Sequence, residues 1–103
     1  MQKILLSPKD SSEVINQIFD FSSLVANGVT IISAATTSVV YRGVDPSPSS
    51  MIYFLNTISG YQVTQRISGG LDGVTYLITC QATLSDSSLV SLFGYLAVIG
   101  ALS

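Results

Sequence analysis

The feature that most constrains the fold is a strict alternation of apolar and polar residues between Val74 and Leu84. Every second residue of this run is apolar, and the set is Val74, Tyr76, Ile78, Cys80, Ala82 and Leu84. The residues between them are threonine or glutamine, with Leu77 as the exception. Because successive side chains of a β-strand point to opposite faces of a sheet, the run predicts a strand with one buried face.

Other strand-like segments recur along the chain, separated by turn signals. They are Glu13–Phe21, Val29–Tyr41, Met51–Ile58, Tyr61–Ile67 and Leu89–Ile99. With the alternating run they give about six or seven strands, and no alternating helix signal accompanies them. The sequence therefore predicts an all-β fold, a single antiparallel β-sandwich domain over residues 1–103 with residues 1–12 as an N-terminal arm.

Local signals between the strands complete this prediction. The strand over Val29–Tyr41 is expected to break near Ala34 and Ala35, and residues 22–27 are expected to form one helical turn. The segment Arg42–Ser50 contains two prolines, which fix φ and lack a backbone donor, and it predicts a loop.

Three glycines cluster just before the alternating run. Gly69, Gly70 and Gly73 are expected to form a turn with positive φ, a conformation that residues with a Cβ resist. A phosphate-binding loop is the alternative, but the segment lacks the Lys-Ser/Thr pair and the helix that such a loop requires. We therefore interpret these glycines as a structural turn.

The last predicted strand, Leu89–Ile99, is apolar on both faces. Such a strand must be covered on both sides, whereas a two-layer sandwich covers only one, so we expect one face to bind another subunit. The residues assigned to that face are Val90, Leu92, Leu96 and Val98. The alternative is that residues 2–6 cover this face within the chain. Only 10% of all residues are charged, against about 25% in typical soluble domains, which also favours a surface buried in an assembly.

Two tyrosines extend the set of interface candidates. Tyr41 and Tyr61 lie near predicted strand ends, where a ring with a polar tip serves a protein contact well.

The uncharged stretch from Leu89 to Leu102 is shorter than the roughly 20 residues that a spanning helix needs, so no membrane span is expected.

Residue types that carry chemistry are scarce. The chain has no histidine, which removes the commonest general base and metal ligand. Its one cysteine, Cys80, lies on the apolar face of the alternating run and is expected to be buried and unreactive. We expect no catalytic residues, no metal and no cofactor. Four scattered cations cannot form a phosphate-binding stripe, so nucleic-acid binding is not expected either.

Motifs in both halves of the chain resemble a family of small tailed-phage virion proteins. In the first half they are Pro8-Lys9-Asp10, Glu13-Val14, Phe19-Asp20-Phe21-Ser22, Leu24, Gly28, Ile31 and Ser33. In the second half they are Ser68-Gly69-Gly70, Gly73, Tyr76 and Thr79. The resemblance spans Pro8 to Val98. It departs from the family pattern at Phe21, where tryptophan is usual, at Val29, where an acidic residue is common, and over Arg42–Ser50.

This resemblance implies both a fold and a function. Members of the family are fibre–tail adaptor or minor structural proteins of phages with an immunoglobulin-like β-sandwich. It implies a non-enzymatic virion protein that joins tail and fibre components in several copies, in the tail or neck region of the particle. Its partners would be other virion proteins and copies of itself. Two alternatives stay open: a capsid decoration or head–tail connection protein and, from another class, a carbohydrate- or cell-surface-binding module.

Overall fold

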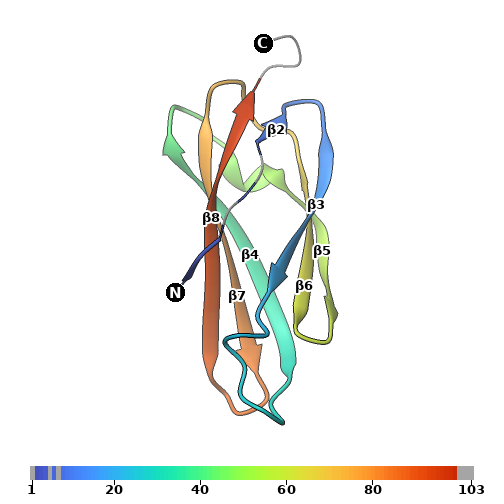
Figure 1. Ribbon diagram of the computed structural model, residues 1–103. Coiled ribbons are helices and arrows are strands. Elements are labelled where there is room, and N and C mark those ends of the chain that lie inside the picture. Colours follow the sequence, from blue (N-terminus) through green and yellow to red (C-terminus); the bar gives the residue numbers. More distant parts are fainter. Residues whose placement is uncertain (1, 5, 7, 100–103) are drawn as a thin grey trace.

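Two β-sheets pack face to face in the computed structural model, which describes residues 2–4, 6 and 8–99 (Figure 1). The first sheet contains β1 (Gln2–Lys3), β2 (Lys9–Asp10), β4 (Ile31–Arg42), β7 (Thr75–Leu84) and β8 (Leu89–Ile99). The second contains β3 (Val14–Asp20), β5 (Ile52–Ser59) and β6 (Gln62–Ser68). A 3₁₀ helix, η1 (Pro48–Met51), precedes β5. The prediction of an all-β fold is confirmed.

The N-terminal arm makes the first sheet mixed. Strands β4, β7 and β8 pair antiparallel in that order, and β1 and β2 both pair in parallel with the other edge of β8. In the second sheet β6 lies between β3 and β5, and both pairings are antiparallel. The prediction of a wholly antiparallel sandwich is therefore wrong. Parallel pairing needs a long connection, and here the body of the chain separates the arm from β8.

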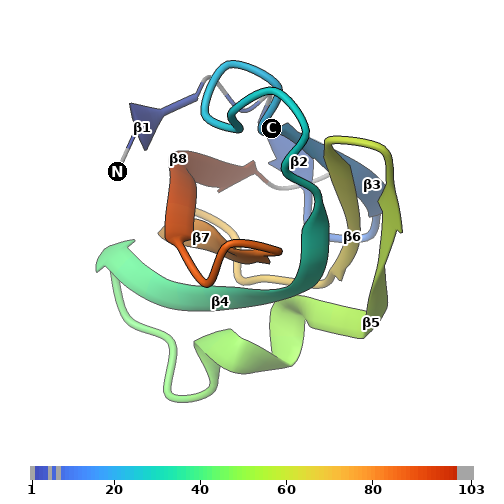
Figure 2. The same ribbon diagram turned by 90° about the horizontal axis from the view of Figure 1, so that it is seen from below.

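The sandwich is long and narrow, with extents of 47 × 21 × 20 Å. In the end-on view the two sheets curl toward each other, and β5 lies beside β4 (Figure 2). The Asn56 side chain joins these two strands, because its Nδ2 donates to the Ala34 carbonyl oxygen at 2.8 Å. One edge of each sheet is therefore protected within the chain.

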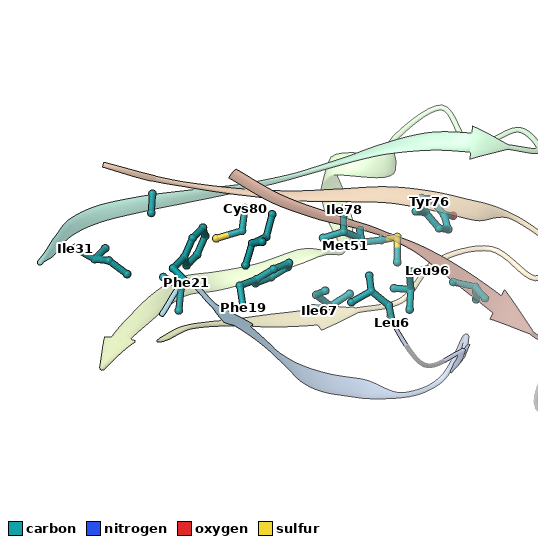
Figure 3. Packing of buried hydrophobic residues seen from close by; sticks show 14 of the residues in the cluster. Leu6, Phe19, Phe21, Ile31, Met51, Ile67, Tyr76, Ile78, Cys80 and Leu96 are labelled. Carbon is teal, nitrogen blue, oxygen red and sulfur yellow. The ribbon is translucent and has the colours of Figure 1, made fainter. Parts of the chain in front are cut away.

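The alternating run forms the central strand of the core. All of its apolar members from Val74 to Leu84 are buried, as the sequence predicts. Figure 3 shows Tyr76, Ile78 and Cys80 reaching from the first sheet toward Phe19 and Ile67 of the second. The core thus lies between the two sheets along their length.

The structure differs from the predicted local features at two places. β4 runs without interruption through Ala34 and Ala35, which pair with Ala82 and Gln81, so the expected break there is wrong. The register of this strand shifts at its two ends instead. Residues 22–27 form turns and no helix, because the Asp20 carboxylate accepts the Ser22 N–H at 2.9 Å and bends the chain directly after β3.

The glycine turn before β7 has the predicted backbone conformation. Gly69, Gly70 and Gly73 have φ values of 70°, 95° and 81°. At Gly70 a Cβ would also lie 2.8 Å from the side chain of Val98, so this glycine is needed for close packing as well.

Candidate assembly surface

The structure places the predicted interface residues of β8 inside the molecule. Leu92, Leu96 and Val98 are 2%, 0% and 1% exposed, and Val90 is partly buried against the same core. The assignment of these residues to an outer surface is therefore wrong. Their face of β8 is covered within the chain, by the second sheet and by Leu6 of the N-terminal arm.

The opposite face of β8 is the outer one, and it continues across β7 and β4. Cross-strand pairs align Val39 of β4 with Leu77 of β7 and Tyr95 of β8. The neighbouring row aligns Thr37, Thr79 and Phe93. Because residues in one row share a side of the sheet, apolar and aromatic residues of three strands meet on one surface.

Aromatic rings form the centre of this surface. The ring centroids of Tyr41 and Tyr95 are 4.3 Å apart with a tilt of 47°. Phe93 meets Tyr95 edge to face at 5.9 Å. Tyr41, which the sequence singled out as an interface candidate, is exposed and belongs to this group. We call Tyr41, Phe93, Tyr95, Leu77 and Val39 the aromatic sheet face.

Two cations lie beside the rings of the aromatic sheet face. Arg42 is the only charged residue of β4, β7 and β8. Its guanidinium carbon lies 5.8 Å from the centroid of Tyr41, and the Lys3 ammonium lies 5.2 Å from the centroid of Tyr95. Cations at these distances interact favourably with the rings and stay available to a partner.

Tyr61, the other predicted interface tyrosine, does not join this group. It lies in the turn between β5 and β6 of the second sheet, where its carbonyl oxygen accepts the Phe21 N–H at 2.8 Å. Phe93, Tyr95 and Lys3 were missed by the sequence reasoning. The outer face of the alternating run, which is rich in threonine, could have indicated the two aromatic residues. Residues of β8 that pair with outward-facing residues of β7 must also point outward.

The resembling motifs of the two chain halves meet at Lys9. Its side chain is fully buried, and its Nζ donates to the carbonyl oxygens of Gly69 at 2.7 Å and Asp10 at 2.8 Å. Burial lowers the pKa of this lysine, and the nearby carboxylates of Glu13 and Asp10 oppose that shift. These contacts fix the N-terminal arm to the glycine turn, which is an architectural role.

Tyr76 makes a second internal connection. Its hydroxyl donates to Asp45 Oδ2 at 2.7 Å and accepts the Leu71 N–H at 2.9 Å. Burial raises the pKa of this tyrosine, and the hydrogen bond to the Asp45 carboxylate adds to the effect. The loop after β4 and the turn before β7 are thus joined through one side chain.

Cys80 is buried as predicted, and its surroundings favour the neutral thiol. Burial raises its pKa from 9.0 to about 11, while Thr36 acts weakly in the opposite direction. A thiol in this state is a poor nucleophile at neutral pH.

Among residues 2–4, 6 and 8–99, the structure contains no group of residues able to hold a metal ion and no pocket. No helix in the part of the chain that the structure describes has the length and apolar character to cross a membrane.

A narrow β-sandwich with aromatic rings and two cations on one outer sheet face has the surface chemistry that is common at protein–protein contacts. The model of the family Gp77, described as podophage GP4 fiber-tail adaptor protein gp77, matches residues 9–91. The chain belongs to this family, and it is a fibre–tail adaptor, a structural protein of the podophage virion located in the phage tail. In comparisons with curated proteins and with solved structures, nothing matches the chain.

Proposed function

We propose that the chain performs its adaptor role without catalysis, by burying the aromatic sheet face against another protein of the tail or fibre. The observation that carries this proposal is the grouping of Tyr41, Phe93 and Tyr95 on one outer surface, next to two cations. Aromatic residues and arginine are enriched at protein interfaces and supply much of their binding energy.

The chemistry of this surface suggests the chemistry of its partner. The centre is apolar, and Lys3 and Arg42 lie at its border, so a matching surface has an apolar centre and carboxylates at its rim. A second copy bound face to face would bring the same cations together. We therefore assign the aromatic sheet face to a different virion protein, and we keep Tyr61 as a candidate contact between copies of the chain.

The fold that presents this surface is, we propose, immunoglobulin-like. The order β3-β6-β5 facing β8-β7-β4 corresponds to the B-E-D and G-F-C strands of that fold, with the N-terminal arm beside the last strand. Tyr76, near the start of the F-equivalent β7, accepts the backbone N–H of Leu71 five residues upstream. This arrangement is similar to the tyrosine corner of immunoglobulin-like domains.

Particle incorporation of surface variants tests the proposed contact. Truncation of a central aromatic anchor at an interface typically costs about 2 kcal/mol, which corresponds to roughly a 30-fold loss of affinity. We expect Tyr95→Ser and Phe93→Ser to reduce the amount of this protein in purified particles while the isolated domain keeps its fold. Ile32→Ser is the control, because Ile32 is 62% exposed and lies about 30 Å from Tyr41 along β4.

Charge-reversal variants test the contribution of the two cations separately from that of the aromatic rings. Arg42→Glu and Lys3→Glu are expected to slow association and to weaken its dependence on salt, because rim charges act mainly on the association rate. Incorporation of Tyr95→Ser at the level of the unmodified protein would contradict the proposed contact.

A further inference from the structure

The middle of β5 leaves the sheet and exposes two large apolar side chains. Tyr53 pairs with Arg66 and Thr57 pairs with Thr64, so three residues of β5 lie opposite the single residue Gln65. The side chains of Phe54 and Leu55 in this bulge are 68% and 93% exposed. The Tyr53 and Phe54 rings contact each other with centroids 4.2 Å apart.

The backbone of this bulge is held in an unfavourable conformation. Phe54 has φ 65°, in the left-handed region that bulky residues with a Cβ rarely adopt. Such a conformation persists only where the surrounding structure fixes it. At this position a glycine or asparagine would form the same bulge with less strain.

Two polar side chains hold the bulge in this conformation through hydrogen bonds. Gln65 is fully buried in β6, and its Nε2 lies 3.0 Å from the Phe54 carbonyl oxygen and 3.3 Å from that of Tyr53. Asn56, the last residue of the bulge, donates to the Ala34 carbonyl oxygen on β4. These bonds replace part of the strand pairing that the bulge interrupts, so the core supports the conformation.

Protection of a sheet edge does not explain why Phe54 and Leu55 occupy the bulge. The edge of β5 already lies beside β4 within the chain, and edges that need protection usually carry charged residues or proline. An exposed phenylalanine and leucine at the bulge instead favour association. The conformation and the side chains together are those of a rigid apolar contact element.

We propose that Phe54 and Leu55 form a knob that inserts into an apolar pocket of a second virion protein. A protruding element needs a concave partner, and the described residues 2–4, 6 and 8–99 of this chain contain no pocket that would receive it from another copy. The nearest charge in the strand pairing is Arg66, opposite Tyr53, and no carboxylate lies on β5. The pocket is therefore apolar and belongs to a different protein.

The knob deepens the adaptor role proposed above and rests on it. An adaptor needs two separate surfaces, one for each component that it joins. The knob lies on β5 of the second sheet, whereas the aromatic sheet face lies on the outer side of β8, β7 and β4 of the first sheet. On this basis we assign one surface to each of two partner proteins.

Three variants separate binding from stability. Phe54→Gly removes the ring and relieves the positive φ, so its melting temperature is expected to stay equal to or rise above that of the unmodified chain. Leu55→Ser removes a fully exposed side chain and is expected to leave the melting temperature unchanged. Both are expected to reduce binding to the partner about 30-fold, as for a hot-spot truncation. Val44→Ser, at a loop position that is 83% exposed, is the control and keeps normal incorporation.

Photocrosslinking in intact particles identifies the occupant. A benzophenone amino acid at position 55 is expected to crosslink to a virion protein other than this chain, whereas crosslinks to a second copy, or none, would overturn the proposal. Normal incorporation of Phe54→Gly and Leu55→Ser would overturn it as well. If Tyr95→Ser is defective in the same assay, the sheet-face contact stands without the knob; if Tyr95→Ser is also normal, both proposals fail.

Discussion

The Leu6 side chain of the N-terminal arm packs directly against Gly94 of β8 in the core. A Cβ on Gly94 would lie 2.7 Å from Leu6 Cγ and 2.9 Å from the Ile4 carbonyl oxygen. The Leu6 side chain thus fills the space that a side chain at position 94 would take. Ile4 is held alongside, because its N–H donates to the Phe93 carbonyl oxygen at 2.7 Å. The arm is a structural part of the sandwich and brings Lys3 to the aromatic sheet face.

Gly94→Ala is expected to destabilise the protein by about 1–3 kcal/mol, because the added methyl group overpacks the core at Leu6. Leu6→Ala is expected to cost roughly 2–4 kcal/mol by leaving a cavity. The two losses should not add, since alanine at position 6 leaves room for the methyl group at position 94. Urea unfolding of both single variants and the double variant measures this coupling, and simple additivity would show that the two residues are not in contact.

The alternation of residues was sufficient to predict which face of β7 is buried. It was not sufficient to predict which face of β8 is buried. β8 is apolar on both faces, so hydrophobicity alone does not distinguish Leu92 from Phe93. The distinction comes from the hairpin, in which Thr83 pairs with Leu89 and Thr79 with Phe93. That register depends on the turn, where Ser87 has φ 71° and the Leu84 N–H bonds the Ser88 carbonyl oxygen.

The β5 bulge was invisible in the sequence for a different reason. Met51–Ile58 has the composition of a buried strand, yet Phe54 and Leu55 are its most exposed residues. The cause is a side chain on another strand, the buried Gln65, which bonds the carbonyl oxygens of the bulge. The one available sign was Gln65, which shares a face of the predicted strand Tyr61–Ile67 with Val63 and Ile67, because a buried amide needs partners.

Tyr76→Phe is expected to destabilise the protein by about 1–2 kcal/mol, because it leaves the Leu71 N–H and the Asp45 carboxylate without this hydroxyl. Asp45→Asn is the matched variant, since it keeps the shape and an acceptor but removes the charge. Thermal unfolding of the two single variants and the double variant gives the coupling energy. A double variant that loses as much as the sum of the single variants would contradict a direct contact.

Lys9→Met is expected to destabilise the protein by about 1–3 kcal/mol at neutral pH, because the carbonyl oxygens of Gly69 and Asp10 lose a buried donor. The pKa of Lys9 is lowered in the folded state, so just below 10.5 the unfolded chain binds more protons than the folded one. The contribution of Lys9 to stability should therefore rise as pH increases toward 10.5. Subtracting the unfolding free energies of the variant from those of the unmodified protein across this range measures the slope. A slope of zero or of the opposite sign would contradict the assignment.

Cys80 is expected to make the protein less stable at alkaline pH. Its pKa is raised in the folded state from 9.0 to about 11, so the folded chain holds the thiol proton more tightly than the unfolded one. The resulting stability is fully present below pH 9 and is lost as pH rises through about 11, which corresponds to roughly 3 kcal/mol. Cys80→Ala lowers stability at pH 7 through a small cavity but lacks this titration. Urea unfolding at intervals from pH 8 to pH 11 should therefore show the two curves converging, since titration of the other groups cancels in the difference. Parallel curves, or rapid thiol labelling of the native protein at pH 8, would show that Cys80 is not held in the apolar core.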